Sequence, residues 1–439
     1  MTTPLTVLHL TPHLGGGVGK ALSGLVRHTP AASGIRHAIV CLEAPEKNQF
    51  VAQLAAAGCP VTACPTPEEL AAQVAQADIV QLEWWGHPAT FAALCQAALP
   101  PLRLLVWCHI SGLHTPRIPS ALLAAAGCGL LTSPATLTAP EVARLPEAVR
   151  QRLAVVHSSG GFDGLIPPVR TADEPLRAGY LGSLNFAKLH PHLIAFLAAV
   201  PLADFRLRLI GDTTNRAVLE RQAWAAGLAD SLDFRGYTTD VATELAAINV
   251  MPYLLNPRHY GTTENALLEA MAMGVVPVVL DNPAERCLVE DGRTGLMVRT
   301  PREFGEAMAW LARHPEERQQ LGAQAAATVR ERFAVEAMVT AFARHYRQLQ
   351  ARAKVRVPFA ELFGPTPADW FLACQGQPEL FTDPQGFAAA DAFVIPGLRE
   401  RTKGSVFHFG HYFPQDSRLS QWQEAVARLG GAMQGERHE

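Results

Sequence analysis

The chain has 439 residues, which is too long for one hydrophobic core and suggests two or three domains of about 150 residues each. Its formal net charge is −3, from 37 basic and 40 acidic residues that are spread evenly along the sequence. This balance lacks the basic footprint of a nucleic-acid-binding protein, so no polynucleotide partner is expected.

Cysteine usage and the N-terminus bear on the compartment. Eight cysteines occur without a C-x-x-C pair, and several lie in apolar runs such as LVWCHI, which predicts buried, reduced thiols in a cytoplasmic protein. The first residues, MTTPLTVLHL, lack the basic segment and apolar run of a signal peptide. No window reaches roughly 18 uninterrupted apolar residues, so a spanning helix is excluded, whereas peripheral contact with the inner face of a membrane stays open.

The first part of the chain alternates short apolar strands with longer amphipathic helices. The strand patterns are TVLHL, HAIVCL, DIVQLEW, RLLVWCH, GLLTS and LAVVHSS, and helical patterns such as GKALSGLVRH and NQFVAQLAAA lie between them. Strands that are apolar at nearly every position are typical of parallel sheets covered on both faces. Residues 1–165 are therefore predicted to form one doubly wound, Rossmann-like domain.

A proline-rich, charged stretch without periodicity marks a linker at residues 166–176. The alternation then begins again with AGYLGS, FRLRLIGD, LDFRG, NVMPY, VVPVVLD and GLMV, which predicts a second Rossmann-like domain over residues 177–334. Residues 301–352 carry helical patterns only. Residues 353–439 are richer in aromatic residues and proline, with one amphipathic helix near 418–429, and the sequence assigns them no fold.

The loop HLGGGVGKAL after the first strand is rich in glycine but fits neither standard nucleotide fingerprint. A Walker A motif requires Gly and Ser or Thr where the chain has Leu14 and Ala21, and G-x-G-x-x-G requires Gly at Lys20. An ATP-binding P-loop is therefore rejected. Two interpretations remain: a plain tight turn, or a flexible backbone at Gly16 and Gly17 that lets a ligand approach a helix N-terminus.

Ligands of doubly wound sheets bind beyond the carboxyl ends of the strands. Two such domains therefore predict an active site in a cleft between their strand ends. Four segments follow such ends: Gly15 to Gly17, His109, Ser183 to Lys188, and Gly261 to Glu269. Their convergence indicates a ligand site more strongly than any one segment.

The stretch HYGTTENALLEAMAMG, residues 259–274, predicts a helix that Thr262 and Thr263 cap, because their hydroxyls can accept from N–H groups of its first turn. Glu264 and Glu269 are five residues apart, roughly 140° around a helix of about 3.6 residues per turn. They therefore do not form one paired-carboxylate site, and one of them needs a different role.

With these segments the chain resembles the retaining nucleotide-sugar glycosyltransferases of family 4, the glycosyl transferases group 1. The resemblance extends over residues 177–350, in AGYLGSLNFAKLHPHLI, ENALLEAMAMGVVPVV and ERCLVEDGRTGLMV, and is weaker in the GGG loop, CHISG and HSSGGFD. It implies an α/β protein of the GT-B fold: two Rossmann-like domains facing across a cleft, here with a C-terminal extension at 353–439. It also implies that a helix at 335–352 crosses back to the N-terminal acceptor domain.

The family motif Glu-x7-Glu is present only in its second acid. Glu269 matches the carboxylate that accepts from two ribose hydroxyls of the nucleotide. Gly261 stands where the first acid contacts the donor sugar, and Glu264 stands where the family has a glycine. Three readings stay open: Glu264 has taken over the sugar contact, it is only a favourable charge at a helix N-terminus worth about 0.3–1 kcal/mol, or activity is lost.

The resemblance also assigns the groups that hold the donor diphosphate. Lys188 matches the lysine that neutralises the leaving group, and the backbone N–H groups of residues 262–264 are expected to hold it at the helix start. Ser183 stands in place of the partner arginine. Arg258 and His259 are candidates to supply the missing cation.

Further family positions carry a functional and a structural interpretation. His109 matches the histidine that reaches the donor sugar or the acceptor, and the alternative is a structural histidine. Tyr237 matches a position bordering the nucleotide base, and the alternative is a surface aromatic residue. Trp84 and Trp85 offer faces to an acceptor sugar, with core packing as the alternative. Asn265 completes the donor-binding residues.

The predicted function is a retaining glycosyltransferase that moves a sugar from a nucleotide-diphosphate sugar to a glycan, lipid-linked or other acceptor in cell-surface polysaccharide synthesis. Neither H-E-x-x-H nor Cys/His ligand spacing occurs, so no metal and no further cofactor are expected. The alternatives are a non-catalytic GT-B subunit that binds a sugar nucleotide or a partner protein, and an enzyme that epimerises the sugar nucleotide.

Overall fold

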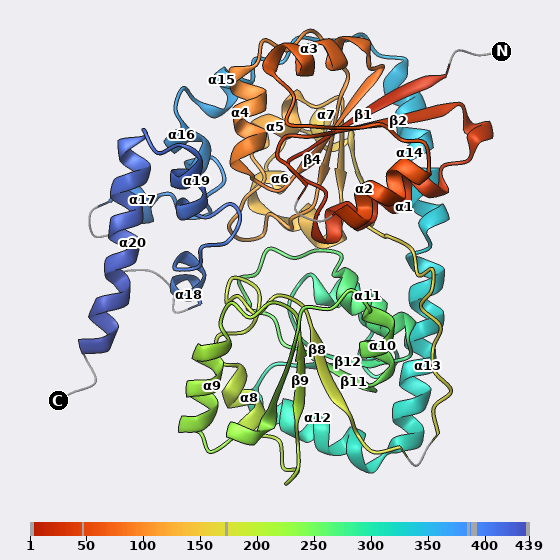
Figure 1. Cartoon of the computed structure of the whole chain (residues 1–439), viewed down its shortest axis with the longest axis vertical. Coiled ribbons are helices and arrows are strands. Elements are labelled where there is room, and N and C mark those ends of the chain that lie inside the picture. Colours follow the sequence, from red (N-terminus) through yellow and green to blue (C-terminus); the bar gives the residue numbers. More distant parts are fainter. Residues whose placement is uncertain (1–3, 46–47, 172–173, 384–386, 388–392, 436–439) are drawn as a thin grey trace. The chain divides into compact units, whose positions relative to one another are not determined.

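The computed structural model describes residues 4–45, 48–171, 174–383, 387 and 393–435. It divides the chain into two compact units, each built around one parallel sheet (Figure 1). The first unit comprises Met1–Gly161, Tyr260–Thr262 and Val335–Glu439, and the second comprises Phe162–His259 and Thr263–Ala334.

The sheet of the first unit has seven parallel strands in the order β3-β2-β1-β4-β5-β6-β7. The strands are β1 Leu5–Thr11, β2 Ile35–Cys41, β3 Val61–Ala63, β4 Ile79–Trp84, β5 Leu104–Cys108, β6 Cys128–Leu131 and β7 Leu153–Val155. This is the doubly wound order, and the strand order reverses between β1 and β4. The predicted Rossmann-like architecture is confirmed for this unit.

Helices cover this sheet on both faces. They are α1 Gly16–His28, α2 Asn48–Ala56, α3 Pro67–Gln76, α4 Pro88–Gln96, α5 Ser120–Ala125, α6 Pro140–Ala143, α7 Glu147–Arg150 and α14 Val335–Gln350, with short 3-10 turns at Ala31–Ser33 and Pro134–Thr138. The core beneath α1 and α14 includes Trp107, whose ring lies 4.8 Å from that of Phe342 on α14. Residues that were expected to cross back to the first domain therefore form part of its core.

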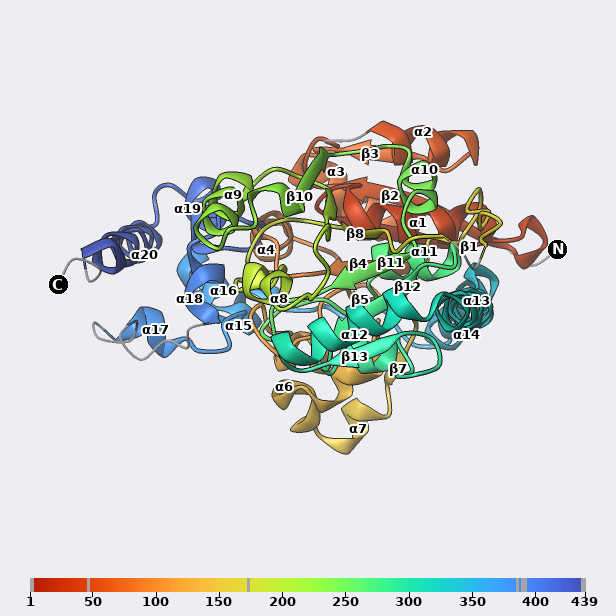
Figure 2. The ribbon, with the colours of Figure 1, turned by 90° about the horizontal axis from the view of Figure 1, so that it is seen from below.

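The C-terminal extension packs as a helical layer on α4. Its helices are α15 Phe359–Phe363, α16 Pro367–Leu372, α17 Glu379–Thr382, α18 Val394–Leu398, α19 Val406–Tyr412 and α20 Ser417–Gly435, and α15, α16 and α19 lie along α4 (Figures 1 and 2). Phe363 stacks on Trp84 at 5.8 Å and meets the edge of Phe91 on α4 at 4.9 Å. The aromatic residues that gave no sequence pattern thus extend the core of the first unit.

The second unit has six parallel strands in the order β10-β9-β8-β11-β12-β13. The strands are β8 Ala178–Leu181, β9 Leu207–Ile210, β10 Leu232–Gly236, β11 Val250–Tyr253, β12 Val276–Leu280 and β13 Leu296–Val298. The helices are α8 Leu193–Ala198, α9 Arg216–Ala225, α10 Val241–Ala246, α11 Asn265–Ala272, α12 Pro301–Arg313 and α13 Pro315–Arg332, with 3-10 turns at Ala229–Ser231 and Glu285–Cys287. The second predicted Rossmann-like domain is also confirmed.

Local sequence explains several helix starts. Thr66 and Glu69 form a capping box around Pro67 at the start of α3, and the Thr300 side chain accepts from the Glu303 N–H at the start of α12, before Pro301. Each cap satisfies an N–H group that has no partner within the helix. These helices therefore begin where their sequence predicts.

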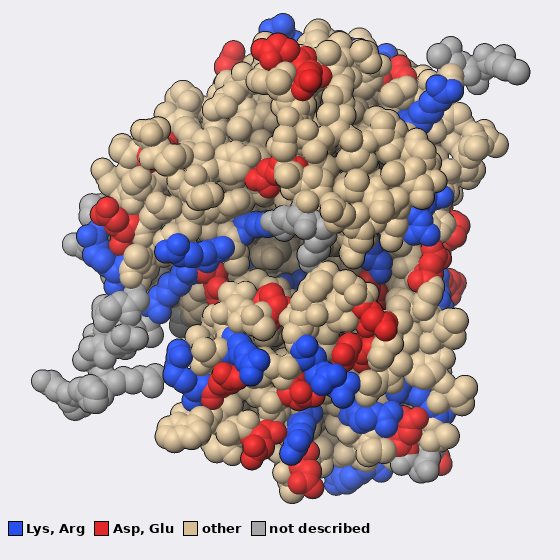
Figure 3. All heavy atoms as spheres, viewed as in Figure 1, with Lys and Arg blue, Asp and Glu red and all other residues tan. Residues whose placement is uncertain are grey.

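Charged side chains lie on the face drawn in Figure 3, and helix length and polarity decide whether a helix can span a membrane. On the face drawn in Figure 3, acidic and basic side chains are interspersed. Within the described part of the chain, every helix is too short or too polar to span a bilayer. All eight cysteines have free thiols, and burial raises the pKa of the Cys41 thiol to about 12.

Candidate active site

Helix α11 begins one residue later than its sequence suggests. Glu264 occupies the N-cap position in an extended conformation, so Thr262 and Thr263 lie before the helix and the prediction that they cap it is wrong. The Thr262 hydroxyl instead accepts a 2.8 Å hydrogen bond from Thr132 within the first unit. The N–H groups of the first helical turn therefore belong to residues 265–267, whereas Thr262 and Thr263 lie outside the helix.

Glu264 forms the centre of a buried polar group in the second unit. Its carboxylate lies 2.7 Å from Lys188 Nζ and accepts a 2.6 Å hydrogen bond from the Tyr253 hydroxyl, while only 4% of the side chain is exposed. Burial alone would raise the pKa of Glu264, but the charges of Lys188 and His259 and these hydrogen bonds hold it below its usual value. Glu264 is therefore an ionised carboxylate whose orientation is set by Lys188 and Tyr253.

This geometry brings together two of the predicted catalytic residues. Lys188 follows β8 and Glu264 follows β11, and these neighbouring strands end at the same edge of the sheet. The Glu264 carboxylate makes no cap on its own helix and points to Lys188 instead. Tyr253, the last residue of β11, was missed by the sequence analysis because it reads as an ordinary apolar strand position.

A second buried pair lies beside this group. His259 Nε2 is 3.2 Å from the Glu285 carboxylate, and both side chains are buried. Burial lowers the pKa of His259, but the charge and hydrogen bond of Glu285 outweigh it and raise the pKa above its usual value. Of the two candidates for the missing cation, His259 is thus the buried, charge-stabilised one, whereas Arg258 is exposed. Glu285 had no signal in the sequence beyond its place after an apolar strand.

Ser183 lies in a hydrogen-bonded loop and provides no positive charge at the position of the family arginine. Its hydroxyl donates to Asp212 at 2.5 Å and accepts from Asn185 at 2.6 Å. Burial would raise the pKa of Asp212, but hydrogen bonds from Ser183 and Thr214 hold it low. The position of the family arginine therefore faces an acidic side chain that the sequence analysis did not single out.

The other donor-binding candidates are placed as follows. Glu269 is buried on α11, and Asn265 is the half-buried first residue of that helix. Gly261 is buried and groups with the first unit. Tyr237 follows β10 and is 56% exposed.

In the first unit, His109 follows β5 and pairs with a buried glutamate. His109 Nε2 lies 2.6 Å from Oε2 of Glu83, a β4 residue with no exposed surface. Oε1 of Glu83 accepts from Gln81 at 2.8 Å and pairs with His9 Nδ1 at 3.3 Å. Burial would raise the pKa of Glu83, but the hydrogen bonds from His109 and His9, together with histidine charge beside it, hold the pKa below its usual value. This network could not be predicted from the sequence, because Glu83 lies inside an otherwise apolar strand pattern.

Trp84 and Trp85 differ in burial: Trp84 lies in the core, whereas Trp85 is partly exposed. Trp84 has no exposed surface and stacks on Phe363, so its predicted contact with an acceptor sugar is wrong and the alternative of core packing holds. Its side chain points to the face of β4 opposite that of its neighbours in the strand. Trp85 is half-buried, and its ring lies 6.2 Å from that of His109.

Gly16 and Gly17 are exposed at the first turn of α1. Gly16 has a φ of +55°, and a Cβ atom there would meet no atom within 4 Å. Both interpretations, a plain tight turn and a ligand contact, are compatible with this exposed turn.

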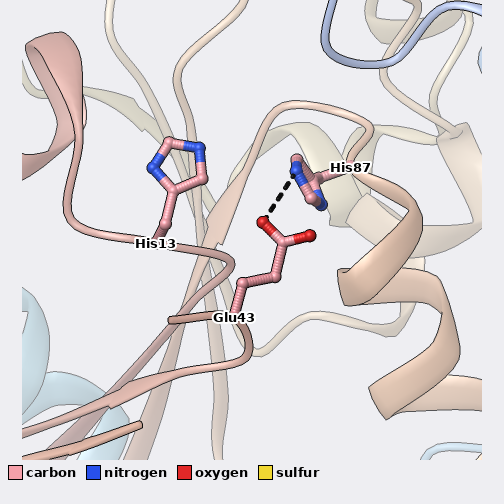
Figure 4. A group of neighbouring side chains, drawn as sticks. All are labelled: His13, Glu43 and His87. Atoms are coloured by element: carbon pink, nitrogen blue, oxygen red, sulfur yellow. Dashed lines mark ion pairs between the residues drawn. The ribbon is translucent and has the colours of Figure 1, made fainter. Parts of the chain in front are cut away.

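His13, Glu43 and His87 converge at the carboxyl ends of β1, β2 and β4, with potential ligand atoms within 4.8 Å of one another (Figure 4). Their hydrogen bonds do not suit a metal. His87 Nδ1 accepts from the Ala89 N–H at 3.2 Å, so its proton sits on Nε2, and His13 Nε2 meets the Lys403 ammonium at 2.9 Å. Metal-binding histidines normally donate through their second nitrogen, whereas both of these accept. Through the contact of Lys403 with His13, the cluster instead links the C-terminal extension to the end of β1.

This cluster predicts an acid-sensitive first unit. Burial, with the nearby charges of His408, His13 and Lys403, lowers the pKa of His87 to about 2. The unfolded chain binds a proton at this position below about pH 6.5 and the folded chain does not, so His87 stabilises the fold above that pH and the stability is lost as pH falls.

His87→Asn tests this pH dependence, because asparagine keeps an N-cap acceptor but does not titrate. In urea unfolding, the wild type should lose about 1.4 kcal/mol more than the variant between pH 7.5 and 5.5. Parallel losses in the two proteins would show that His87 is not the titrating group.

Comparisons with known proteins show the fold class and the class of enzyme. Two parallel, helix-covered sheets of seven and six strands define the GT-B fold class, and the predicted fold is confirmed. Residues 175–314 match the family model described as "Glycosyl transferases group 1". The chain thus carries a group 1 glycosyltransferase domain and is a transferase. No curated protein sequence matches the chain.

Solved structures share the fold at low sequence identity. HepE of Anabaena in complex with UDP-glucose is 18% identical with a TM-score of 0.63, over 78% of this chain and 100% of that chain. Sucrose-phosphate synthase of Thermosynechococcus elongatus is 18% identical with a TM-score of 0.62, over 80% and 100%. The lipopolysaccharide outer core galactosyltransferase WaaB is 15% identical with a TM-score of 0.55, over 79% and 99%.

Proposed function

We propose that the chain is a retaining glycosyltransferase that moves a sugar from a nucleotide-diphosphate sugar to a glycan or lipid-linked acceptor. The observation that carries this proposal is the Lys188–Glu264 pair at the carboxyl ends of β8 and β11, within the residues that match the glycosyltransferase family. The complexes of HepE with UDP and UDP-glucose make a uridine nucleotide the first donor to test. The likeness to WaaB supports an acceptor in a cell-surface polysaccharide.

In this proposal the second unit stabilises the leaving group without a metal. The bond between the anomeric carbon and the diphosphate oxygen breaks, and a bond to the acceptor oxygen forms as the acceptor hydroxyl passes its proton to the departing diphosphate oxygen. Negative charge develops on the departing diphosphate. It is stabilised by Lys188, the His259 imidazolium and the N–H groups of residues 265–267. Glu264 directs Lys188 and takes the sugar contact that Gly261 lacks.

The nucleotide site is tested with Glu269→Gln. An amide keeps the volume of the side chain but offers one acceptor oxygen to the ribose diol where the carboxylate offers two. UDP should raise the melting temperature of the wild type by mass action, and the variant should bind UDP about 10- to 100-fold more weakly. Thermal shift with UDP, ADP and GDP, followed by calorimetric titration, measures both.

A matched control is Glu306→Gln on the exposed face of α12, which should keep the wild-type affinity for UDP. Equal binding by Glu269→Gln and wild type would remove Glu269 from the ribose site. Incubation with UDP-glucose and analysis of the released sugar then distinguish transfer or hydrolysis from epimerisation.

A further inference from the structure

The carboxylate of Glu83 receives more donors on one oxygen than on the other. Oε1 faces the Gln81 amide and His9 Nδ1, whereas Oε2 faces one donor among the described residues, His109 Nε2. An ionised carboxylate can only accept, so the ring nitrogen of His109 at 2.6 Å must carry a proton. A buried carboxylate without exposed surface also needs a compensating positive charge nearby.

The neighbouring hydrogen bonds place that charge on His9. The single hydroxyl proton of Thr29 is donated to the Leu25 carbonyl at 2.7 Å, so His37 Nε2, 3.1 Å from the same oxygen, is the donor in that contact. Burial and the charge of His9 lower the pKa of His37, which is therefore neutral and accepts through Nδ1. His9 Nε2, 2.8 Å away, must then donate, as its Nδ1 does to Glu83. His9 carries protons on both nitrogens and neutralises Glu83.

Because His9 already supplies the positive charge beside Glu83, we assign His109 as a neutral imidazole. Its Nε2 holds the proton that bonds to Glu83, and its Nδ1 makes no hydrogen bond to any residue that the structure describes. The ring lies at the end of β5, 6% exposed, between Trp107 and the half-buried Trp85. Nδ1 therefore offers a lone pair at the edge of the sheet where ligands of this fold bind.

We propose that Glu83 is a positioning residue that locks His109 in the Nε2–H tautomer, so that Nδ1 accepts a hydrogen bond from a hydroxyl group of the sugar substrate. The substrate class rests on the proposed function; the tautomer lock itself does not. A histidine without such a partner interconverts between two tautomers, one of which would present an N–H donor and repel the hydroxyl proton. The dyad thereby selects a hydroxyl donor at this position.

Glu83→Gln gives a sharp test, because the two oxygens have different numbers of donors. The amide oxygen should take the place of Oε1, where it satisfies Gln81 and His9, and the amide NH₂ should then face His109 Nε2. That nitrogen must now accept, so the His109 proton should move to Nδ1. Long-range ¹H–¹⁵N spectra of histidine-labelled protein report which ring nitrogen is protonated, and His109→Asn assigns the signals.

The wild type should show protonated Nε2 and bare Nδ1 at pH 7.5, and Glu83→Gln should show the reverse. Tyr346→Phe is the matched control: it removes the 2.5 Å hydrogen bond from Tyr346 to Gln81 but leaves the Glu83–His109 bond, and should keep the wild-type pattern. A wild type with protonated Nδ1, or a tautomer that ignores Glu83→Gln, overturns the proposal.

A second readout separates this proposal from the proposed function. With UDP-glucose as the probe, Glu83→Gln should lower kcat for its turnover by about 10²-fold while the UDP-induced thermal shift stays at its wild-type value. Absence of any UDP shift in the wild type would contradict the proposed donor and leave the tautomer result standing. A reversed tautomer with unchanged kcat would contradict the substrate contact of Nδ1.

Discussion

Lys188→Met should abolish most sugar transfer and destabilise the second unit. Removing one cation from the developing diphosphate should lower kcat by about 10²–10³-fold. The same change leaves the buried carboxylate of Glu264 with the Tyr253 hydroxyl as its hydrogen-bond donor and without its ion-pair partner, and breaking a buried ion pair in this way costs about 3–5 kcal/mol. Steady-state kinetics and urea unfolding measure the two effects separately.

The double variant Lys188→Met with Glu264→Gln distinguishes stability from chemistry. Replacing both partners removes the uncompensated carboxylate, so most of the lost free energy of unfolding should return while kcat stays low. Recovery of kcat with stability would mean that Lys188 acts only in the fold. A single Lys188→Met variant as stable as wild type would show that the pair is already solvated in solution.

Ending the chain at Arg352 should yield an aggregated first unit. Helices α15, α16 and α19 cover α4, and without them the aromatic surface around Phe91 and Trp84 would face water. Large exposed apolar patches of this kind drive association. Expression of the shortened chain should therefore give insoluble protein, measured by sedimentation of the lysate.

Phe363→Ala is the milder form of the same test. Phe363 packs against both Trp84 and Phe91, so the variant should lose about 3–5 kcal/mol of unfolding free energy. Val355→Ala, at an exposed side chain of the same extension, should change it by less than about 0.5 kcal/mol. A soluble chain ending at Arg352 with wild-type stability would show that the extension is a separate layer.

Most of the architecture could be predicted because strands buried on both faces are apolar at nearly every position. Each of the six strand patterns of the second unit corresponds to an observed strand. Strand β3, Val61–Ala63, was missed because it has only three residues and none is buried. In the extension the helix predicted near 418–429 is confirmed by α20, but the other helices were not predicted, because they are short and bury aromatic residues by tertiary packing that leaves no periodicity in sequence.

The candidate site was predictable only where a residue belongs to a sequence motif. Lys188 and Glu264 were singled out through the resemblance to the glycosyltransferase family, and the structure brings them into contact. Their partner Tyr253 and the pair of Glu83 with His109 arise from neighbouring strands, so a one-dimensional pattern cannot express them. The cap of α11 was predicted wrongly because two threonines before a helix satisfy the capping rule, whereas the chain stays extended through Glu264.

The first unit is assembled from both ends of the chain, and this affects its synthesis. Phe91 on α4 leaves the ribosome about 300 residues before Phe409, whose ring packs against it at 5.9 Å. At about 5–20 residues per second, α4 waits roughly 15–60 s for the helices that cover it. The nascent N-terminal half therefore carries an open apolar face through most of translation, which gives a chaperone a defined surface and a defined interval in which to bind it.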